Sequence, residues 1–475
     1  MDTQKTDKPV RLTRREMLKL SGTLAVGTLL AACGPSATPE ATTAPSTTAP
    51  EVTEAPVTVP TAAAVTGNVV VMHKVQQGEL TEDMVAQFEA ENPGITVEAV
   101  QDDLTRFFAM YAAGNPPDLV RVQAPSVPPY LARGMLYDLT PYFEASSVLR
   151  PDDLAPANNY YKAEDPLHVG SGRLYGMCKD WSPDFTLYAY KTAFADKGIT
   201  LPSETEPLTY QQAYDLGAQL ATFDGDRVTM FGFDYPDMWV DRIWMNILGE
   251  VGSLLYADDY TQIVLAGNET AQEVLHYFYN HAKDRLGAVG AINPSPNWIG
   301  DDFDKGLVGL LMYGYWFSAM AETDVTTGQV LFIPGPTWTG VRRDPTMTAT
   351  GMVMSAISQV PDAAWKVFEW YNGKEPAVAR SSSGWGVPAL KSMYDQMPNT
   401  SVFEQQKRRV LQGELDLATP PVQFNPYIGA TVVADTWLLY LEQALSGDMT
   451  LDELLGTVET EVNTAIQEGM ERTEG

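Results

Sequence analysis

The sequence is poor in cysteine, histidine and positive charge. Its 475 residues include 2 cysteines, 4 histidines and 31 lysines and arginines, against 61 aspartates and glutamates. The resulting net charge of −30 argues against a nucleic-acid partner, because an anionic surface repels phosphates. With so few cysteines, a zinc–thiolate site is excluded.

Familiar catalytic motifs are also missing. The sequence has no Walker A pattern, no His-Glu-x-x-His and no Gly-x-Ser-x-Gly. His276 and His281 are five residues apart, a spacing that does not place both on one face of a helix. Asp180 and Asp184 form one acidic pair and residues 301–304 hold another cluster, but such groups arise by chance among 61 acids. We therefore expect no catalytic residue, no cofactor and no metal site.

The remaining composition is that of a folded protein. The hydrophobic fraction is 44% and the charged fraction 19%, which is too apolar for a disordered chain. The length predicts two or more domains.

The N-terminus has the order of features that is typical of an export signal. Arg14 and Arg15 precede an uncharged run over residues 20–32, which is too short to span a membrane as a mature helix. The twin arginines resemble a bacterial Tat signal, and the small residues before Cys33 resemble a lipobox. We expect residues 1–32 to be a signal peptide and Cys33 to be lipidated. The mature protein would then be anchored to the outer face of the bacterial cytoplasmic membrane, at the cell surface or in the periplasm.

A tether is predicted to follow the lipidated cysteine. After Cys33, residues 34–66 are almost entirely alanine, threonine, proline, serine, valine and glutamate, without an aromatic residue. Such a segment cannot bury enough apolar surface to fold, so residues 33–66 are interpreted as the lipidated cysteine and a disordered tether. Cys178 would then have no intramolecular disulfide partner.

The globular region opens with strands that alternate with helices. Residues 68–72 and 95–100 predict strands, and a short third strand begins at Asp118. Between the first two, Thr81 is a candidate N-cap for a helix that ends at residues 92–94. This alternation is typical of a layered α/β domain with a largely parallel sheet.

The later sequence is more helical. Capping boxes are predicted at Thr209 and at Thr450, and amphipathic helices over residues 270–282 and 363–371. The uncharged run 306–321 is interrupted by aromatic residues and glycines. We interpret it as buried core that leads to a cleft, rather than as a membrane span.

Short motifs then occur in a consistent order from about residue 68 to the C-terminus. They are residues 88–97 (FEAENPGITV), 112–120 (AAGNPPDLV), 131–140 (LARGMLYDLT), 174–177 (LYGM), 187–191 (LYAYK), 314–316 (GYW) and 385–389 (WGVPA). In this order they resemble the extracellular solute-binding proteins of bacterial ABC importers, in the large sugar-binding, maltose-binding-like family.

The resemblance implies an α/β, two-lobed periplasmic-binding-protein fold with a hinge and a ligand cleft between the lobes. The chain would cross between lobes near residues 182–186, 334–341 and 375–384. The N-terminal lobe would comprise residues 67–181 plus 341–375, and the C-terminal lobe residues 186–334 plus 384–475. Ligand contacts from both lobes would favour a closed state.

Candidate ligand-binding residues follow from the chemistry of sugars. An aromatic face covers the apolar side of a sugar ring, while polar side chains bind its hydroxyl groups. Candidates at strand ends and loops of the implied cleft are Lys74, Gln76, Gln77, Gln123, Trp181, Trp239, Trp316, Trp385 and Tyr427.

The sequence thus predicts a binding protein, not an enzyme. We expect a monomer that binds a saccharide, an oligosaccharide or glycoside, and delivers it to ABC permease subunits in the membrane. Two alternatives stay open. One is a secreted glycosidase, which would need two carboxylates facing each other across the sugar. The other is a binding protein for a cationic solute such as a polyamine, which the acidic composition favours.

Overall fold

The computed structural model describes residues 65–290, 292–295, 297–343, 346, 348–415, 417 and 424–474. All of them fall within one unit of the chain, Val57–Gly475. The predicted signal peptide and Cys33 lie outside the described residues, and so does the predicted tether except for its last two positions.

The first of two five-stranded sheets has the strand order β2-β1-β3-β13-β6. Its strands are β1 (Gly67–His73), β2 (Ile95–Gln101), β3 (Leu119–Val122), β6 (Gly176–Cys178) and β13 (Gly351–Met354). β1 pairs in parallel with both β2 and β3, while β13 runs antiparallel to β3 and β6. Because β1 and β3 are parallel neighbours, the residues that follow them meet at one edge of the sheet.

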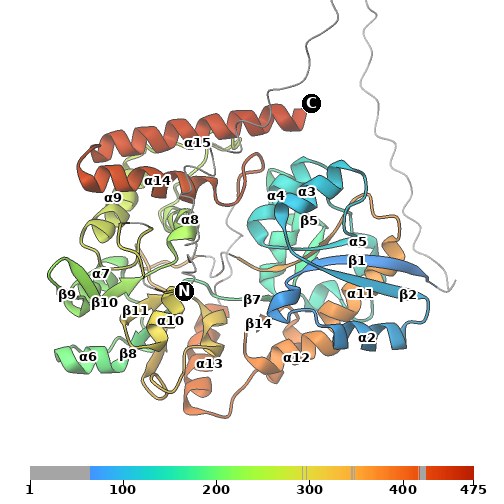
Figure 1. Ribbon diagram of the computed structural model, residues 1–475, viewed down its shortest axis with the longest axis horizontal. Coiled ribbons are helices and arrows are strands. Elements are labelled where there is room, and N and C mark those ends of the chain that lie inside the picture. The colour runs from blue at the N-terminus through green and yellow to red at the C-terminus, as the bar shows by residue number, and fades with distance from the viewer. Residues whose placement is uncertain are drawn as a thin grey trace, which may run out of the picture. The chain divides into compact units, whose positions relative to one another are not determined.

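Helices pack against this sheet, as the right-hand part of Figure 1 shows for α2 and α11. The helices of this part of the chain are α2 (Glu82–Glu91), α3 (Leu104–Ala112), α4 (Val127–Ala132), α5 (Thr140–Ala145), α11 (Pro361–Gly373) and α12 (Glu375–Ser383). The predicted start of α2 is confirmed, since the Thr81 hydroxyl accepts a hydrogen bond from the Met84 N–H at 3.3 Å.

The second sheet has the strand order β12-β8-β11-β10-β9. Its strands are β8 (Leu187–Tyr190), β9 (Thr222–Asp224), β10 (Arg227–Asp234), β11 (Val308–Met312) and β12 (Val330–Ile333). Only the pair β10 and β11 is parallel. Every residue of β11 is buried, which confirms that the uncharged run 306–321 passes through the core.

The helices associated with the second sheet include the longest one described. They are α6 (Lys191–Lys197), α7 (Tyr210–Leu220), α8 (Val240–Glu250), α9 (Glu269–Lys283), α10 (Ile299–Asp304), α13 (Val402–Leu415), α14 (Val432–Ser446) and α15 (Leu451–Glu474). α14 and α15 lie side by side (Figure 1). Both predicted capping boxes are confirmed, at Thr209 with Gln212 and at Thr450 with Glu453.

Smaller elements complete the fold. β4 (Lys162–Asp165) and β5 (His168–Leu174) form one antiparallel pair, and β7 (Asp180–Trp181) and β14 (Val387–Pro388) form another. The short 3-10 helices are η1 (Val75–Gln77), η2 (Ala124–Ser126), η3 (Pro151–Asp153), η4 (Pro156–Tyr161), η5 (Asp237–Trp239), η6 (Tyr315–Ala319) and η7 (Lys391–Gln396).

The chain passes between the two sheets through connections that include residues 182–186 and 334–350. The predicted third crossing at 375–384 is wrong. That segment forms α12, which packs against α11, and the following β14 pairs with β7. A new helix starts directly after α11, with Pro376 in its first turn.

The third connection lies between η7 and α13. The Ser392 side chain and N–H, within η7, donate hydrogen bonds to the carboxylate of Asp153, in the segment that precedes β6. α13 instead packs against β12 of the second sheet. Residues 384–396 therefore associate with the first sheet.

Candidate functional site

A cavity of about 220 Å³ lies where the connections between the two sheets meet. Lys74 directly follows β1 and Gln123 directly follows β3, so the parallel pairing of these strands brings both residues to it. Further lining residues come from β7 and its neighbours and from the segment before β13. They are Lys179, Asp180, Trp181, Ser182, Thr348 and Thr350.

Indole rings form much of the remaining wall. Trp239 belongs to η5, Trp316 to η6, and Trp385 to the loop between α12 and β14. The Trp316 and Trp385 ring centroids are 6.2 Å apart at an interplanar angle of 46°. The Ser182 hydroxyl accepts a hydrogen bond from the Trp316 N–H at 3.2 Å, so a residue of the first connection positions an indole of the second sheet's side.

The structure brings together six of the nine residues predicted to bind ligand. They are Lys74, Gln123, Trp181, Trp239, Trp316 and Trp385. Lys74 and Gln123 were predicted because each follows a strand, Trp181 because it lies at the first predicted crossing, and Trp385 because it lies in a late loop. Trp316 was predicted because it follows the uncharged run, and Trp239 because it lies in a tryptophan-rich segment.

Of the other three predicted residues, Gln76 and Tyr427 do not line this cavity. Gln76 is exposed, and its backbone N–H donates to the side-chain oxygen of Gln101 at 2.9 Å. Gln77 ends η1, and its side chain lies outside the description. The backbone of Tyr427 packs directly against Gly469 of α15. A Cβ at position 469 would collide with the Tyr427 carbonyl.

Glycine is favoured at the two positions beside Trp385 for different physical reasons. Gly384 has φ +74°, in the left-handed region that glycine adopts without strain. A Cβ on Gly386 would lie 3.1 Å from the Cβ of Asp180. Residues 384–389 match the pattern Gly-x-Gly-x-x-Ala of dinucleotide-binding loops, but here the strand β14 follows the glycines in place of the helix of a dinucleotide-binding fold.

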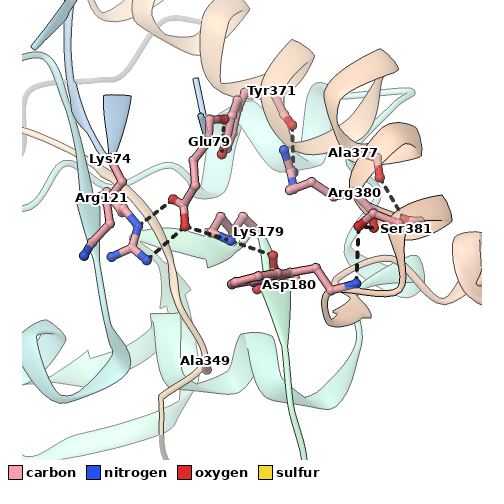
Figure 2. Close-up of polar contacts among 12 residues, drawn as sticks. Lys74, Glu79, Arg121, Lys179, Asp180, Ala349, Tyr371, Ala377, Arg380 and Ser381 are labelled. Carbon is pink, nitrogen blue, oxygen red and sulfur yellow. Dashed lines mark hydrogen bonds and ion pairs between the residues drawn. The ribbon is translucent and has the colours of Figure 1, made fainter. Parts of the chain in front are cut away.

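A charged network, which the sequence did not reveal, forms one side of the cavity. Figure 2 shows the Glu79 carboxylate between Arg121 and Lys179. Arg121 binds it in a bidentate manner, with Nε 2.8 Å from Oε2 and Nη2 3.2 Å from Oε1. The Lys179 ammonium lies 3.5 Å from Glu79 and 2.6 Å from Asp180.

This network keeps its charges in spite of burial. Burial by itself would raise the pKa of Glu79, but the charges of Lys179 and Arg121 outweigh it and lower the pKa to about 2. Burial would lower the pKa of Lys179, but Asp180 and Glu79 outweigh it and raise the pKa. Glu79 lies 41 or more positions from each cation in the sequence, so only the fold could reveal the set.

His73, at the end of β1, is buried behind this network and neutral. Burial is the main cause that lowers its pKa to about 3. Its Nδ1 accepts a hydrogen bond from the Lys74 N–H at 3.0 Å, which fixes the proton on Nε2. His73 therefore orients the backbone at Lys74 and contributes no charge.

Trp298 is a further aromatic residue near the site that the sequence analysis missed. Its ring stacks near Trp316, with centroids 6.2 Å apart and an interplanar angle of 28°. Its Nε1–H donates to the Tyr313 hydroxyl at 2.9 Å, and 43% of the residue is exposed. An exposed tryptophan before a short helix gave no sequence signal for this stacking.

No metal centre is present within the described residues, where no group of three or more histidines, cysteines, aspartates or glutamates gathers. Cys178 is buried, and its thiol donates to the Asn158 side-chain oxygen at 3.2 Å. Burial raises the pKa of this thiol, so it stays protonated and serves packing. Across the described part of the chain, no helix is long and apolar enough to cross a membrane.

The sequence model of the bacterial extracellular solute-binding proteins matches residues 74–378. The chain belongs to this family. Among curated proteins, none matches the sequence. The family assignment made from the ordered motifs is thereby confirmed.

Solved structures of sugar-binding proteins share the two-lobed α/β fold of this family member. An ABC substrate-binding protein from Listeria monocytogenes in complex with cycloalternan is 21% identical, with a TM-score of 0.67, over 84% of this chain and 99% of that one. The sugar-binding protein MalE from Xanthomonas citri is 16% identical, with a TM-score of 0.66, over 86% and 99%. The galacto-N-biose/lacto-N-biose I-binding protein from Bifidobacterium longum, in complex with lacto-N-biose, has the same values. At these identities the likeness concerns the fold, and it confirms the predicted fold class.

Proposed function

We propose that this solute-binding protein binds a saccharide, an oligosaccharide or glycoside, in the cavity between the two sheets and delivers it to ABC permease subunits. The observation that carries the proposal is the composition of the cavity wall. Indole rings stand beside neutral groups such as Gln123 and Thr350, and this is the combination that sugar rings and their hydroxyls require.

The position of the cavity suggests how binding would be signalled. Its lining residues come from both sheets and from the connections between them. We propose lobes of residues 67–181 plus 341–375 and of residues 186–334 plus 384–475, with the segment up to residue 396 reassigned to the first. A ligand that contacts both lobes stabilises the closed form and shifts a hinge equilibrium, which the permease can sense.

Neighbouring indoles support an extended ligand. Trp385 and Trp316 both line the cavity with ring centroids 6.2 Å apart, and Trp298 lies 6.2 Å beyond Trp316, outside that lining. A single sugar ring covers one indole, so adjacent indoles favour an oligosaccharide over a monosaccharide.

Membrane anchoring is part of the proposal. The small residues before Cys33 and the unfoldable composition of residues 34–66 support a lipid-anchored monomer at the outer face of the cytoplasmic membrane. Replacing Cys33 by serine should release the protein from the membrane fraction of a bacterial expression host. Retention of the C33S protein in that fraction would contradict the anchor.

The alternatives fit the cavity less well. A glycosidase needs an acid group that can give up a proton, whereas Glu79 is held ionised by two cations. Its carboxylate and that of Asp180 also contact the same ammonium, that of Lys179, instead of flanking a free space. A cationic solute would meet Lys74, Arg121 and Lys179 at the cavity wall.

A thermal-shift screen against a panel of saccharides tests the proposal. A ligand at 100 times its dissociation constant should stabilise the protein by about 2.7 kcal/mol. The bound saccharide should be recovered chemically unchanged after incubation. No stabilisation by any saccharide, or release of shortened products, would overturn the proposed function.

A further inference from the structure

The charges around the cavity do not balance, and the imbalance has the opposite sign to that of the whole protein. Three cations and two carboxylates line the cavity: Lys74, Arg121, Lys179, Glu79 and Asp180. The complete chain carries a net charge of −30. A local positive excess in so acidic a protein is not expected from composition alone.

The two carboxylates are fully engaged with two of the cations. Glu79 is held by both nitrogens of the Arg121 fork, and Asp180 lies 2.6 Å from the Lys179 ammonium (Figure 2). Such charge-assisted pairs neutralise their members for a ligand that approaches from the cavity. The third cation, Lys74, makes no side-chain hydrogen bond or ion pair with any residue that the structure describes.

Charges just behind the lining leave this excess unchanged. Arg380 donates to the Tyr371 carbonyl at 2.9 Å and lies over the Tyr371 ring at 4.3 Å. Asp102 is near enough to Arg121 to favour its charged form. These two groups have opposite signs, and so do Asp184, which accepts hydrogen bonds from Thr348, and Arg242, which interacts with Asp184. The positive charge of Lys74 is therefore left facing the cavity.

The surroundings strengthen the effect of this charge. Arg121 uses Nε and Nη2 for Glu79, and its Nη1 makes no hydrogen bond within the described part of the chain. The indoles of Trp181 and Trp316 exclude water from part of the wall, which lowers the local dielectric and lengthens the reach of charge. An ammonium beside a free guanidinium N–H is a recognition site for an anionic oxygen group.

Resting on the proposed function, we infer that the saccharide carries an anionic group, the carboxylate of a uronic acid or a sulfate ester, which pairs with Lys74 and the free edge of Arg121. The indoles cover the sugar rings, and the anionic group fixes the orientation of the chain between them. Neutral saccharides bind the same cavity more weakly, because Lys74 then meets only hydroxyl groups.

The experiment measures dissociation constants by calorimetry for three probes: trigalacturonate, a sulfated carrageenan oligosaccharide and neutral maltotriose. We expect one of the acidic probes to bind at least about tenfold more tightly than maltotriose, the gain that an added charged hydrogen bond supplies. The acidic probe that binds identifies the anionic group as carboxylate or sulfate. This preference should diminish as the salt concentration rises.

Variants of Lys74 show whether the preference comes from this residue. K74Q should lose about tenfold more affinity for the acidic probe than for maltotriose, whereas K74R should retain the preference. The matched control is K283Q, an exposed lysine of α9 away from the cavity, which should bind like the wild type. Each variant should unfold at the wild-type temperature, because Lys283 is exposed and the Lys74 side chain pairs with no acid among the residues that the structure describes.

The outcomes separate this inference from the proposed function. Equal or tighter binding of maltotriose, or an equal loss on both probe types in K74Q, would overturn the inference and leave saccharide binding intact. Failure of all three probes and of the wider saccharide panel would overturn both.

Discussion

The two sides of the cavity carry different kinds of side chain. The side that belongs to the first sheet holds the charged network of Glu79, Arg121 and Lys179, together with the indoles of Trp181 and Trp385. The side that belongs to the second sheet offers the indoles of Trp239 and Trp316 and adds no charged group to the lining. The charged side must be pre-assembled, since every buried charge needs its partner, whereas the purely aromatic side needs only shape. The charge that orients a ligand thus comes from the first side, and both sides supply contact area.

Breaking the charged side should have the largest effect, and it should appear in stability. E79Q leaves Arg121 and Lys179 buried without their shared carboxylate, which should lower the free energy of unfolding by about 3–5 kcal/mol. Chemical denaturation measures it. The control is E468Q, which removes an exposed pair with Arg472 and should cost at most about 1 kcal/mol. Equal losses in the two variants would contradict the pre-assembled network.

Breaking the aromatic side should instead appear in binding. W316A removes the ring that lies between Trp385 and Trp298, and should weaken saccharide binding by about 2 kcal/mol or more, roughly 30-fold. Calorimetry with the saccharide found in the screen measures this loss. Unchanged affinity in a folded W316A protein would show that the Trp316 indole does not bind the saccharide.

Lowering the pH should distinguish the neutral His73 from the charged Glu79 by the pH range in which each affects stability. His73 is buried with a pKa of about 3 against an ordinary value of 6.5, so the unfolded chain binds a proton that the folded protein does not. Stability is therefore full above pH 6.5 and falls as the pH drops toward 3, by about 1–2 kcal/mol between about pH 7 and pH 5 from this group.

Glu79 does not contribute in the same range. Its pKa is lowered to about 2 from 4.5, so its contribution is complete above pH 4.5 and is lost only below it. H73Q should flatten the stability profile between pH 7 and about pH 5, as followed by thermal unfolding in buffers of graded pH. A profile as steep as that of the wild type would contradict a buried neutral His73.

The smallest expected effect tests whether the aromatic side extends as far as Trp298. W298A should weaken a trisaccharide by about 1 kcal/mol, roughly fivefold, and leave a disaccharide unaffected, because only the longer chain reaches this ring. F223A is the matched control, since Phe223 has the same exposed fraction of 43% and packs with Arg285 instead. Equal losses for short and long ligands would assign Trp298 a supporting role beneath Trp316.

Sequence patterns predicted the parts of this protein that depend on local chemistry. The N-cap of α2 at Thr81 and the boxes at Thr209 and Thr450 were readable because capping uses residues three positions apart. Lys74 and Gln123 were placed correctly at the cavity because the ends of parallel strands share one edge. The family was readable for a similar reason, since its motifs are short and keep their order.

Tertiary structure alone decided what depends on distant partners. The third connection was misplaced because the family resemblance gave only its approximate position, and the sequence did not predict that α12 starts directly after α11. Glu79, Arg121 and Lys179 are ordinary charged residues in the sequence, and they form one network only because β1, β3 and the segment after β6 end together. Charge acts through space over several ångströms, so its pairing, and the single cation left over, emerge only when the chain has folded.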